Sequence, residues 1–399
     1  MINFNIPKND LVKLSYFITI DNLSWWVIQL TFWLIFIVTR MKANHKSSFN
    51  KLILLMTWIL IVTFTTWNFI VFYIIFEISI VVVLVMIIKW GYQPERVEAI
   101  VFIVIMTVIV SLPFITSIIL NLTKLRFWLA QTGISLWDYL RFMLVLMIKM
   151  PVFFLHTWLP KVHVESPVHG SIILAAILLK LGSYGMIRVT NLCCFIRNQL
   201  KPTIISFGLW TTLMLRTVCV MQTDLKTLIA YSSVVHITVV IITIILNKNS
   251  SITASLVIML GHGMCSSGLF YVANVIYKMS KSRRIIMNKG LIVLTPSLLI
   301  IWFWLCIGNA PMPPSINLLG EFLAFKSIIG WVEIIYPYLA LIIFSSSFYR
   351  IYIFYIPSHG SFTKLVVKLI PVSSKCLFIL LIHIIPLIGI MIKPQVIII

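Results

Sequence analysis

The stretch GSIILAAILLKLGSYGMIRV, residues 170–189, decides the fold of this chain. It is apolar and long enough to cross the ~30 Å hydrocarbon core of a bilayer as one helix, yet Lys180 stands near its middle. A charge near a bilayer centre costs roughly 2.5–3.5 kcal/mol. A leucine would fill the same space without that cost. The sequence therefore indicates that Lys180 faces a wet or paired interior, where it moves protons, ions or substrates.

A second lysine inside an apolar stretch occurs in WDYLRFMLVLMIKMPVFFLHTWLP, residues 137–160, where Lys149 lies two residues before Pro151. Proline has no N–H and frees a carbonyl in the preceding turn, so the helix is expected to break there. The prolines within residues 311–314 interrupt a second apolar segment. Broken backbone at membrane depth is tolerated only inside protein or beside a wet cavity. Two such breaks near ionisable residues are typical of transporters built from inverted repeats.

Composition sets the class of protein. The chain has 399 residues, 61% of them hydrophobic and only 10% charged, whereas soluble domains carry about 25% charged residues. We therefore expect an all-α, polytopic membrane protein with a single integral membrane domain over residues 1–399. Inverted repeats are expected at about 50–190 and 203–356, although the sequence shows no clear symmetry. The expected helices, about 12 if the last broken pair counts as one, lie at about 24–39, 52–66, 68–89, 98–120, 137–158, 168–190, 203–220, 227–246, 252–277, 290–307 with 316–331, 336–356 and 376–393.

The net charge of +21 is interpreted as a membrane signal. Lys and Arg are about twofold more frequent on one side of the expected helices, the side that holds the basic run 278–289. We assign that side to the cytoplasm or mitochondrial matrix, where basic residues meet anionic lipid headgroups. No nucleic-acid-binding motif is visible, so nucleic acid is not an expected partner. The N-terminus resembles neither a cleavable signal nor a transit peptide.

Cofactor motifs are missing from the sequence. The six cysteines form no CxxC pair, so neither a disulfide framework nor a metal site is expected. There is no GxGxxG dinucleotide loop, no cysteine framework for iron–sulfur clusters and no flavin site. Any redox chemistry linked to this chain would take place elsewhere.

Among the ten acidic residues, only Glu77 and Glu321 lie deep in apolar runs. Glu77 is surrounded by aromatic and β-branched residues, so its carboxylate should need a cation, and Lys149 is the natural candidate. An ion pair that forms and opens would load and release a proton at Lys149. The alternative is a static pair that joins two helices, but a buried pair contributes little net stability. Lys149 could also snorkel to an interface.

Two histidines and their surroundings complete the candidate set. His236 and His262 titrate near neutral pH and could relay protons between lysines, or could be satisfied interior donors. Glu321, just past the second break, suits the last exchange with the opposite aqueous face, unless it is an exposed acid at a helix end. Nearby serines could hold ordered water or bond to their own helices; they are Ser232, Ser233, Ser266 and Ser267.

These segments together resemble a known family. LPKVHVESPVHGSIILAAILLKLGSYGMIR (159–188), QTDLKTLIAYSSVVHI (222–237), GHGMCSSGLFYVAN (261–274) and NAPMPPSINLLGEF (309–322) occur in the order found in the chain 4 family of NADH–ubiquinone oxidoreductase, the antiporter-like membrane subunits of mitochondrial respiratory complex I. FYIIFE (72–77) fits upstream. The individual motifs are shared more loosely with subunits 2 and 5 and with Mrp-type cation/proton antiporters. His169 departs from the family, which has a small residue there, and the family's first two helices have no counterpart.

The resemblance implies a proton relay through a Glu/Lys/His row, coupled to electron transfer from NADH to ubiquinone. By position, the family's proton-path residues match Glu77, Lys149, Lys180 and Glu321, and its axial histidines match His236 and His262. It also implies a multi-pass subunit of the mitochondrial inner membrane, beside antiporter-like subunits 2 and 5 and accessory subunits. NADH, FMN, iron–sulfur clusters and ubiquinone would bind to other subunits. The alternatives are an Mrp-type antiporter subunit, complex I subunit 2 or 5, and a membrane scaffold.

Overall fold

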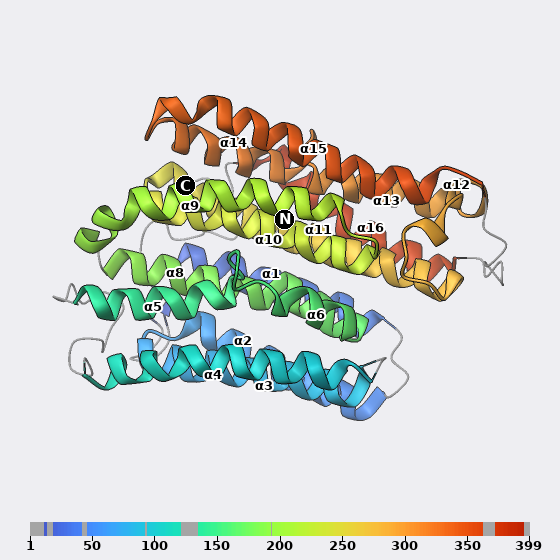
Figure 1. Ribbon diagram of the computed structural model, residues 1–399. Coiled ribbons are helices and arrows are strands. Elements are labelled where there is room, and N and C mark those ends of the chain that lie inside the picture. Colours follow the sequence, from blue (N-terminus) through green and yellow to red (C-terminus); the bar gives the residue numbers. More distant parts are fainter. Residues whose placement is uncertain are drawn as a thin grey trace.

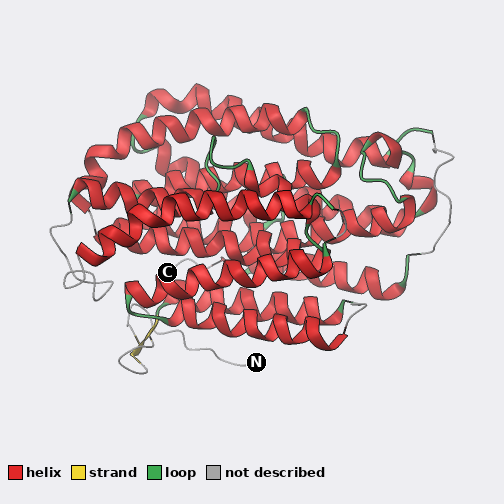
Figure 2. Ribbon diagram, turned by 60° about the horizontal axis from the view of Figure 1, so that its bottom comes forward, coloured by secondary structure: helices red, strands yellow, loops and turns green. Residues whose placement is uncertain are grey.

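The computed structural model describes residues 12–13, 19–41, 46–91, 94–120, 135–192, 194–361 and 372–394. Almost all of these residues are helical, and the helices run side by side along one direction (Figures 1 and 2). One two-residue strand pair, β1 Val12–Lys13 with β2 Thr19–Ile20, precedes the first helix. The helices are α1 Asn22–Arg40, α2 Lys46–Thr65, α3 Phe69–Trp90, α4 Arg96–Leu120, α5 Leu136–Lys149, α6 Trp158–Glu165, α7 Val168–Ile173, α8 Leu179–Leu192, α9 Cys194–Val220, α10 Leu225–Leu246, α11 Asn249–Ser280, α12 Leu291–Leu294, α13 Pro296–Asn309, α14 Ile316–Ile329, α15 Tyr336–Ser358 and α16 Ser374–Ile392.

The all-α membrane architecture is confirmed. Within the described residues, 10 helices are long and apolar enough to cross a membrane, or up to 11 if a bent pair counts as one span. The expected count of about 12 is not confirmed. The reason is that α5, α6 and α14, which belong to broken helices, are each too short to qualify alone.

The break at Pro151 is wider than the sequence predicts. The expected helix 137–158 ends early, because α5 stops at Lys149. A separate helix, α6, begins at Trp158, extends to Glu165 where no helix is expected, and lies end to end with α5 (Figure 1). Phe154 in the connection has a positive φ of 74°. The Ile148 carbonyl, left over by the break, accepts a hydrogen bond from Trp158 Nε1 at 3.1 Å, which satisfies a polar group that lipid could not.

The second broken segment differs in its start. The expected helix 290–307 begins instead at Pro296, because proline suits the first turn of a helix and cannot continue one. The short piece before it, which ends at Leu294, is bent by 117° against α13. The break at residues 310–315 separates α13 from α14 as predicted.

Burial shows which helices form the centre. All of the apolar window of α11 is buried and 94% of that of α10, against 17% for α4. The outer helices expose apolar side chains such as Ile109, 61% exposed, as expected for surfaces that face lipid. The two central helices therefore hold His236 and His262 away from lipid. The inverted repeats remain a prediction.

Small residues let the central helices approach closely. A Cβ added at Gly182 would lie 2.6 Å from Met150 Cγ, and one at Gly185 would lie 3.0 Å from Leu146 Cδ2. On α14, a Cβ at Gly320 would lie 2.7 Å from Ile258 Cγ1 and 3.1 Å from the Ile258 backbone nitrogen. These contacts fix the distance between the helices that carry the buried charged groups.

Gly320→Ala is therefore expected to destabilise the chain by about 1–3 kcal/mol, because the added methyl group meets backbone that cannot move aside. Gly389→Ala is the matched control, since a Cβ there has nothing within 4 Å. Thermal unfolding of both variants in mild detergent measures the difference. Equal stability of the two variants would contradict the packing argument.

Candidate functional site

The pair predicted between Glu77 and Lys149 is present. Lys149 Nζ lies 3.2 Å from Glu77 Oε2 and joins α5 to α3. Lys149 is the last residue of α5, so the break holds its ammonium within the bundle. Its side chain is 6% exposed and that of Glu77 is 29% exposed, so the snorkelling alternative is wrong for Lys149. The Lys149 ammonium also lies 5.2 Å from the centre of the Phe76 ring.

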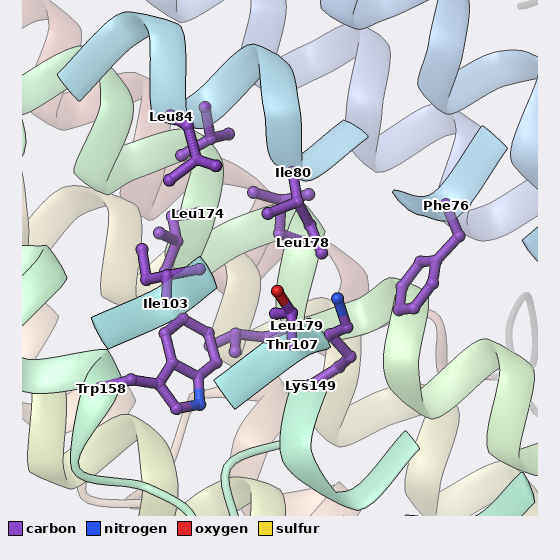
Figure 3. Close-up of a pocket in the computed structure, with 11 residues that line it drawn as sticks. Phe76, Ile80, Leu84, Ile103, Thr107, Lys149, Trp158, Leu174, Leu178 and Leu179 are labelled. Atoms are coloured by element: carbon purple, nitrogen blue, oxygen red, sulfur yellow. The ribbon is translucent and has the colours of Figure 1, made fainter. Parts of the chain in front are cut away.

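Lys149 opens onto a largely apolar cavity of about 40 Å³ between α3, α4 and the middle of the α7–α8 helix (Figure 3). Figure 3 shows the ammonium of Lys149 and the hydroxyl of Thr107 among aliphatic side chains and the indole of Trp158. A volume of this size has room for a few water molecules. Lys149 can therefore meet both a carboxylate and water.

Lys180 lies directly after a π-helical turn, Leu174–Leu178, that joins α7 to α8. Its Nζ donates to the carbonyl of Ala175 at 2.7 Å and lies 2.9 Å from His262 Nδ1. Lys180 is 2% exposed and lies near the middle of the apolar span Val168–Asn191. π turns often occur at functional sites because they free carbonyls from the regular ladder.

A second cavity, of about 10 Å³, lies beside Lys180, His262 and His236, which is the space that one water molecule needs. Leu179 lines this cavity and also the cavity beside Lys149. The side chain of Leu179 thus stands at the boundary between the two lysine sites.

The third group joins α10, α14 and α15. Glu321 Oε1 lies 3.2 Å from His236 Nδ1 and 3.2 Å from Arg350 Nη2. Glu321 is 4% exposed, so the exposed-acid alternative is wrong. His236 Nε2 lies 3.0 Å from Asn309 Oδ1, at the end of α13. The rings of His236 and His262 are 5.2 Å apart, which connects this group to Lys180.

Two arginines beside Glu321 are missing from the predicted set. Arg350 lies inside the expected helix 336–356 and Arg216 inside the expected helix 203–220. The free-energy cost of burying a charge in an apolar helix therefore indicates a buried site for both arginines. Arg350 Nε also donates to Tyr349 Oη at 3.1 Å. Arg216 is 1% exposed, and its Nε and Nη1 have no hydrogen-bond partner among the described residues. Of these two arginines, only Arg350 contacts the Glu321 carboxylate directly among the described residues, and the buried Arg216 interacts electrostatically with the same carboxylate.

A separate polar cluster was also missed. Arg283 Nη1 lies 3.5 Å from Glu165 Oε1, and Lys226 Nζ donates to the carbonyls of Val164 and Ser166 at 3.2 and 3.4 Å. Glu165 follows a single apolar residue and precedes a serine. It does not lie in a long apolar run, so the sequence does not indicate that its carboxylate is buried. The cluster holds the end of α6 against the start of α10 and the basic loop after α11.

Most of the nearby serines bond to their own helices. Ser232, Ser233 and Ser267 donate to carbonyls three residues back in their own helices, at 2.7, 2.6 and 2.9 Å. The buried Ser266 hydroxyl has no such partner among the described residues. His169, the residue that departs from the family pattern, packs its ring 4.9 Å from that of Phe49 on α2.

The described residues contain no group of three or more His, Cys, Asp or Glu side chains that could hold a metal ion. The site is instead a row of titratable groups in three contacts, from Glu77 through Lys149, Lys180 and the two histidines to Glu321. A multi-pass helical bundle with broken helices and a buried charged row defines the class of antiporter-like membrane subunits.

The comparisons identify the family. The chain belongs to the NADH:quinone oxidoreductase/Mrp antiporter transmembrane family, which matches residues 66–348, and within it to the NADH-ubiquinone oxidoreductase chain 4 proteins. It is 37% identical to chain 4 of Ceratitis capitata over 99% of this chain and 91% of the relative. It is 35% identical to chain 4 of Lumbricus terrestris, covering 94% and 87%.

Two solved structures share the fold. Respiratory complex I from Thermus thermophilus matches with a TM-score of 0.83 and 23% identity, covering 94% of this chain and 82% of the other. The Mrp complex from Dietzia matches with a TM-score of 0.84 and 14% identity, covering 96% and 82%. Both likenesses concern the fold alone.

The shared carboxylate gives a testable consequence. Glu321→Gln is expected to destabilise the chain by about 3–5 kcal/mol, because it leaves Arg350 and Arg216 buried without their counter-charge. Adding Arg216→Met to this variant should restore part of the loss. Thermal unfolding of the purified complex measures both. A double variant no more stable than Glu321→Gln would show that Arg216 does not depend on Glu321.

Proposed function

We propose that this chain moves protons across the mitochondrial inner membrane as a membrane-arm subunit of the H⁺-translocating NADH:ubiquinone oxidoreductase. The observation that carries the proposal is the row of three buried contacts, Lys149–Glu77, Lys180–His262 and His236–Glu321, at 3.2, 2.9 and 3.2 Å. Each contact joins groups that can exchange or share a proton. The family supplies the coupling to NADH oxidation.

The geometry supports a relay in which charge controls proton affinity. With the Glu77 carboxylate 3.2 Å away, the Lys149 ammonium is stabilised in its charged form. When the carboxylate moves off, the ammonium is left in an apolar cavity and releases its proton to water there. Lys180 Nζ, on the far side of Leu179, accepts the proton and passes it on to His262 Nδ1, 2.9 Å away.

The last steps run through the His236–Glu321 contact. The adjacent rings of His262 and His236 bring the proton towards Glu321, whose carboxylate exchanges it with the opposite aqueous face. Arg350 keeps Glu321 charged between transfers, since its guanidinium lies 3.2 Å from the carboxylate. Each proton moved against the membrane potential costs roughly 2.3 kcal/mol per 100 mV, so the free energy must come from redox chemistry outside this chain.

The proposal places the redox centres and the other partners elsewhere in the complex. NADH, FMN, iron–sulfur clusters and ubiquinone are bound by other subunits, and the neighbours of this chain are antiporter-like subunits 2 and 5 with accessory subunits. Copurification in mild detergent with flavin- and iron–sulfur-containing subunits is the result expected for this assembly.

Lys149→Ala is expected to reduce the protons pumped per NADH oxidised at least several-fold, because it removes the group that Glu77 controls. The matched control is Lys161→Ala, which breaks an exposed pair: Lys161 Nζ lies 3.1 Å from Glu98 Oε1, with side chains 47% and 71% exposed. Dye-detected acidification of vesicles that hold the complex measures pumping. Normal pumping by an assembled Lys149→Ala complex would favour a scaffold.

Leu179→Ala is expected to raise passive proton leak, because it removes the side chain at the boundary of the two cavities. Leu178→Ala is the control, since Leu178 lines only the cavity beside Lys149. The decay of an imposed pH gradient across vesicles, without NADH, measures the leak. Equal leak in both variants would remove Leu179 as the barrier.

The alternative function is that of an Mrp-type cation/proton antiporter subunit, which shares the fold. That function predicts sodium-dependent proton exchange in vesicles without NADH. Its absence, together with copurification of NADH-oxidising subunits, would exclude the antiporter.

A further inference from the structure

A second kind of site lies at one end of the bundle, apart from the buried charged row. The C-terminal ends of α1 and α11 and the N-terminal end of α16 enclose a cavity of about 240 Å³. The three helices pack together. This end carries the basic run after α11 and is the side to which the sequence assigns the richer loops.

The rim of this cavity is basic. Arg40, Lys278 and Lys375 line it, one from each helix, and all three are exposed at the surface. Among the described residues, none that lines the cavity is acidic. Three cations from separate helices thus lie around one cavity, and no acidic side chain among its described lining residues offsets their repulsion. This is the charge pattern of an anion-binding site.

The start of α16 adds to this positive field. Ser373 precedes the helix without a side-chain cap bond and also lines the cavity. Unsatisfied N–H groups at a helix N-terminus favour phosphate and other anions. The hydroxyl of Ser373 donates to Cys376 Sγ at 3.2 Å.

The floor of the cavity is apolar and continues into the membrane-spanning parts of the helices. Tyr271, Val275 and Met279 on α11 and Ile379 on α16 line it and are 5–7% exposed. A free phosphate would gain nothing from this floor, whereas a phospholipid would place acyl carbons on it.

From this arrangement we infer that the cavity binds one anionic phospholipid, with its phosphate among Arg40, Lys278 and Lys375 and an acyl chain on the apolar floor. The inference goes beyond the proposed function and does not depend on it, because binding is measured without NADH. The occupant is a lipid because cationic rim and apolar floor meet at the level where headgroups meet hydrocarbon.

The test uses the complex that contains the full chain, delipidated in mild detergent and titrated with photoactivatable phosphatidylglycerol. Labelling of the peptides around Tyr271–Met279 and Cys376–Ile379 is the expected result. The triple variant Arg40→Gln, Lys278→Gln and Lys375→Gln should weaken this labelling on the order of 100-fold, at about fivefold per cation. The control triple Lys51→Gln, Lys89→Gln and Arg284→Gln removes three exposed cations from outside the cavity and should leave labelling nearly unchanged.

Two further arms separate the possible occupants in the wild-type complex, so the test does not depend on whether a variant assembles. A phosphatidylcholine probe should label these peptides much less, and millimolar inorganic phosphate should not displace phosphatidylglycerol. Equal labelling by phosphatidylcholine, displacement by phosphate, or equal loss in both triple variants would overturn the inference. So would wild-type peptides that crosslink to a neighbouring subunit and not to lipid.

Discussion

A charge inside a bilayer has to be paired, and this requirement shapes the rest of the chain. Each ionisable group of the central row lies beside another polar group. Pairing groups from α3 with α5, α8 with α11, and α10 with α14 and α15 also ties together helices that are far apart in the sequence. The charged row therefore helps to determine which helices are neighbours.

Breaks and small residues are the devices that make this pairing possible. The interruption after Lys149 ends α5 inside the bundle, and the interruption before Ile316 does the same near Glu321. Glycine at positions 182 and 320 lets the neighbouring backbone approach where a methyl group would not fit. The regular helix is interrupted at the breaks, which leaves backbone polar groups without their helical hydrogen bonds. Such groups can bond within the protein instead, as the Ile148 carbonyl does by accepting from Trp158.

Much of this arrangement could be predicted from the sequence because the bilayer limits the choices. Apolar runs give many of the helices to within a few residues, although the broken helices differ more and α9 begins at Cys194 and not at residue 203. A charge in such a run indicates a buried site, as for Lys180. The pair of Glu77 and Lys149 followed from the need of a lone carboxylate for a cation. Arg350 is absent from the predicted set, although it too is a charge inside an apolar run and the same argument applies to it.

Other features could not be predicted from the sequence. The length of the break after Lys149 depends on tertiary contacts such as the Trp158 hydrogen bond. The Glu165–Arg283 contact joins an amphipathic short helix to a loop, where no apolar run marks a buried charge. The position of Leu179 between two cavities follows from packing, since one leucine among many has no distinguishing pattern.

The π turn at Leu174–Leu178 has a consequence for how this protein can change in evolution. A π turn holds one more residue than an α turn. It therefore changes the direction in which all later side chains of the helix point about its axis. Deleting one residue there would rotate the following helix by about 100° and draw it back by about 1.5 Å. Lys180 would then lose its contact with His262 although no ionisable side chain had been altered. An insertion or deletion in this stretch changes no charged residue. It would nevertheless disrupt the contacts of the charged row as severely as replacing Lys180 itself.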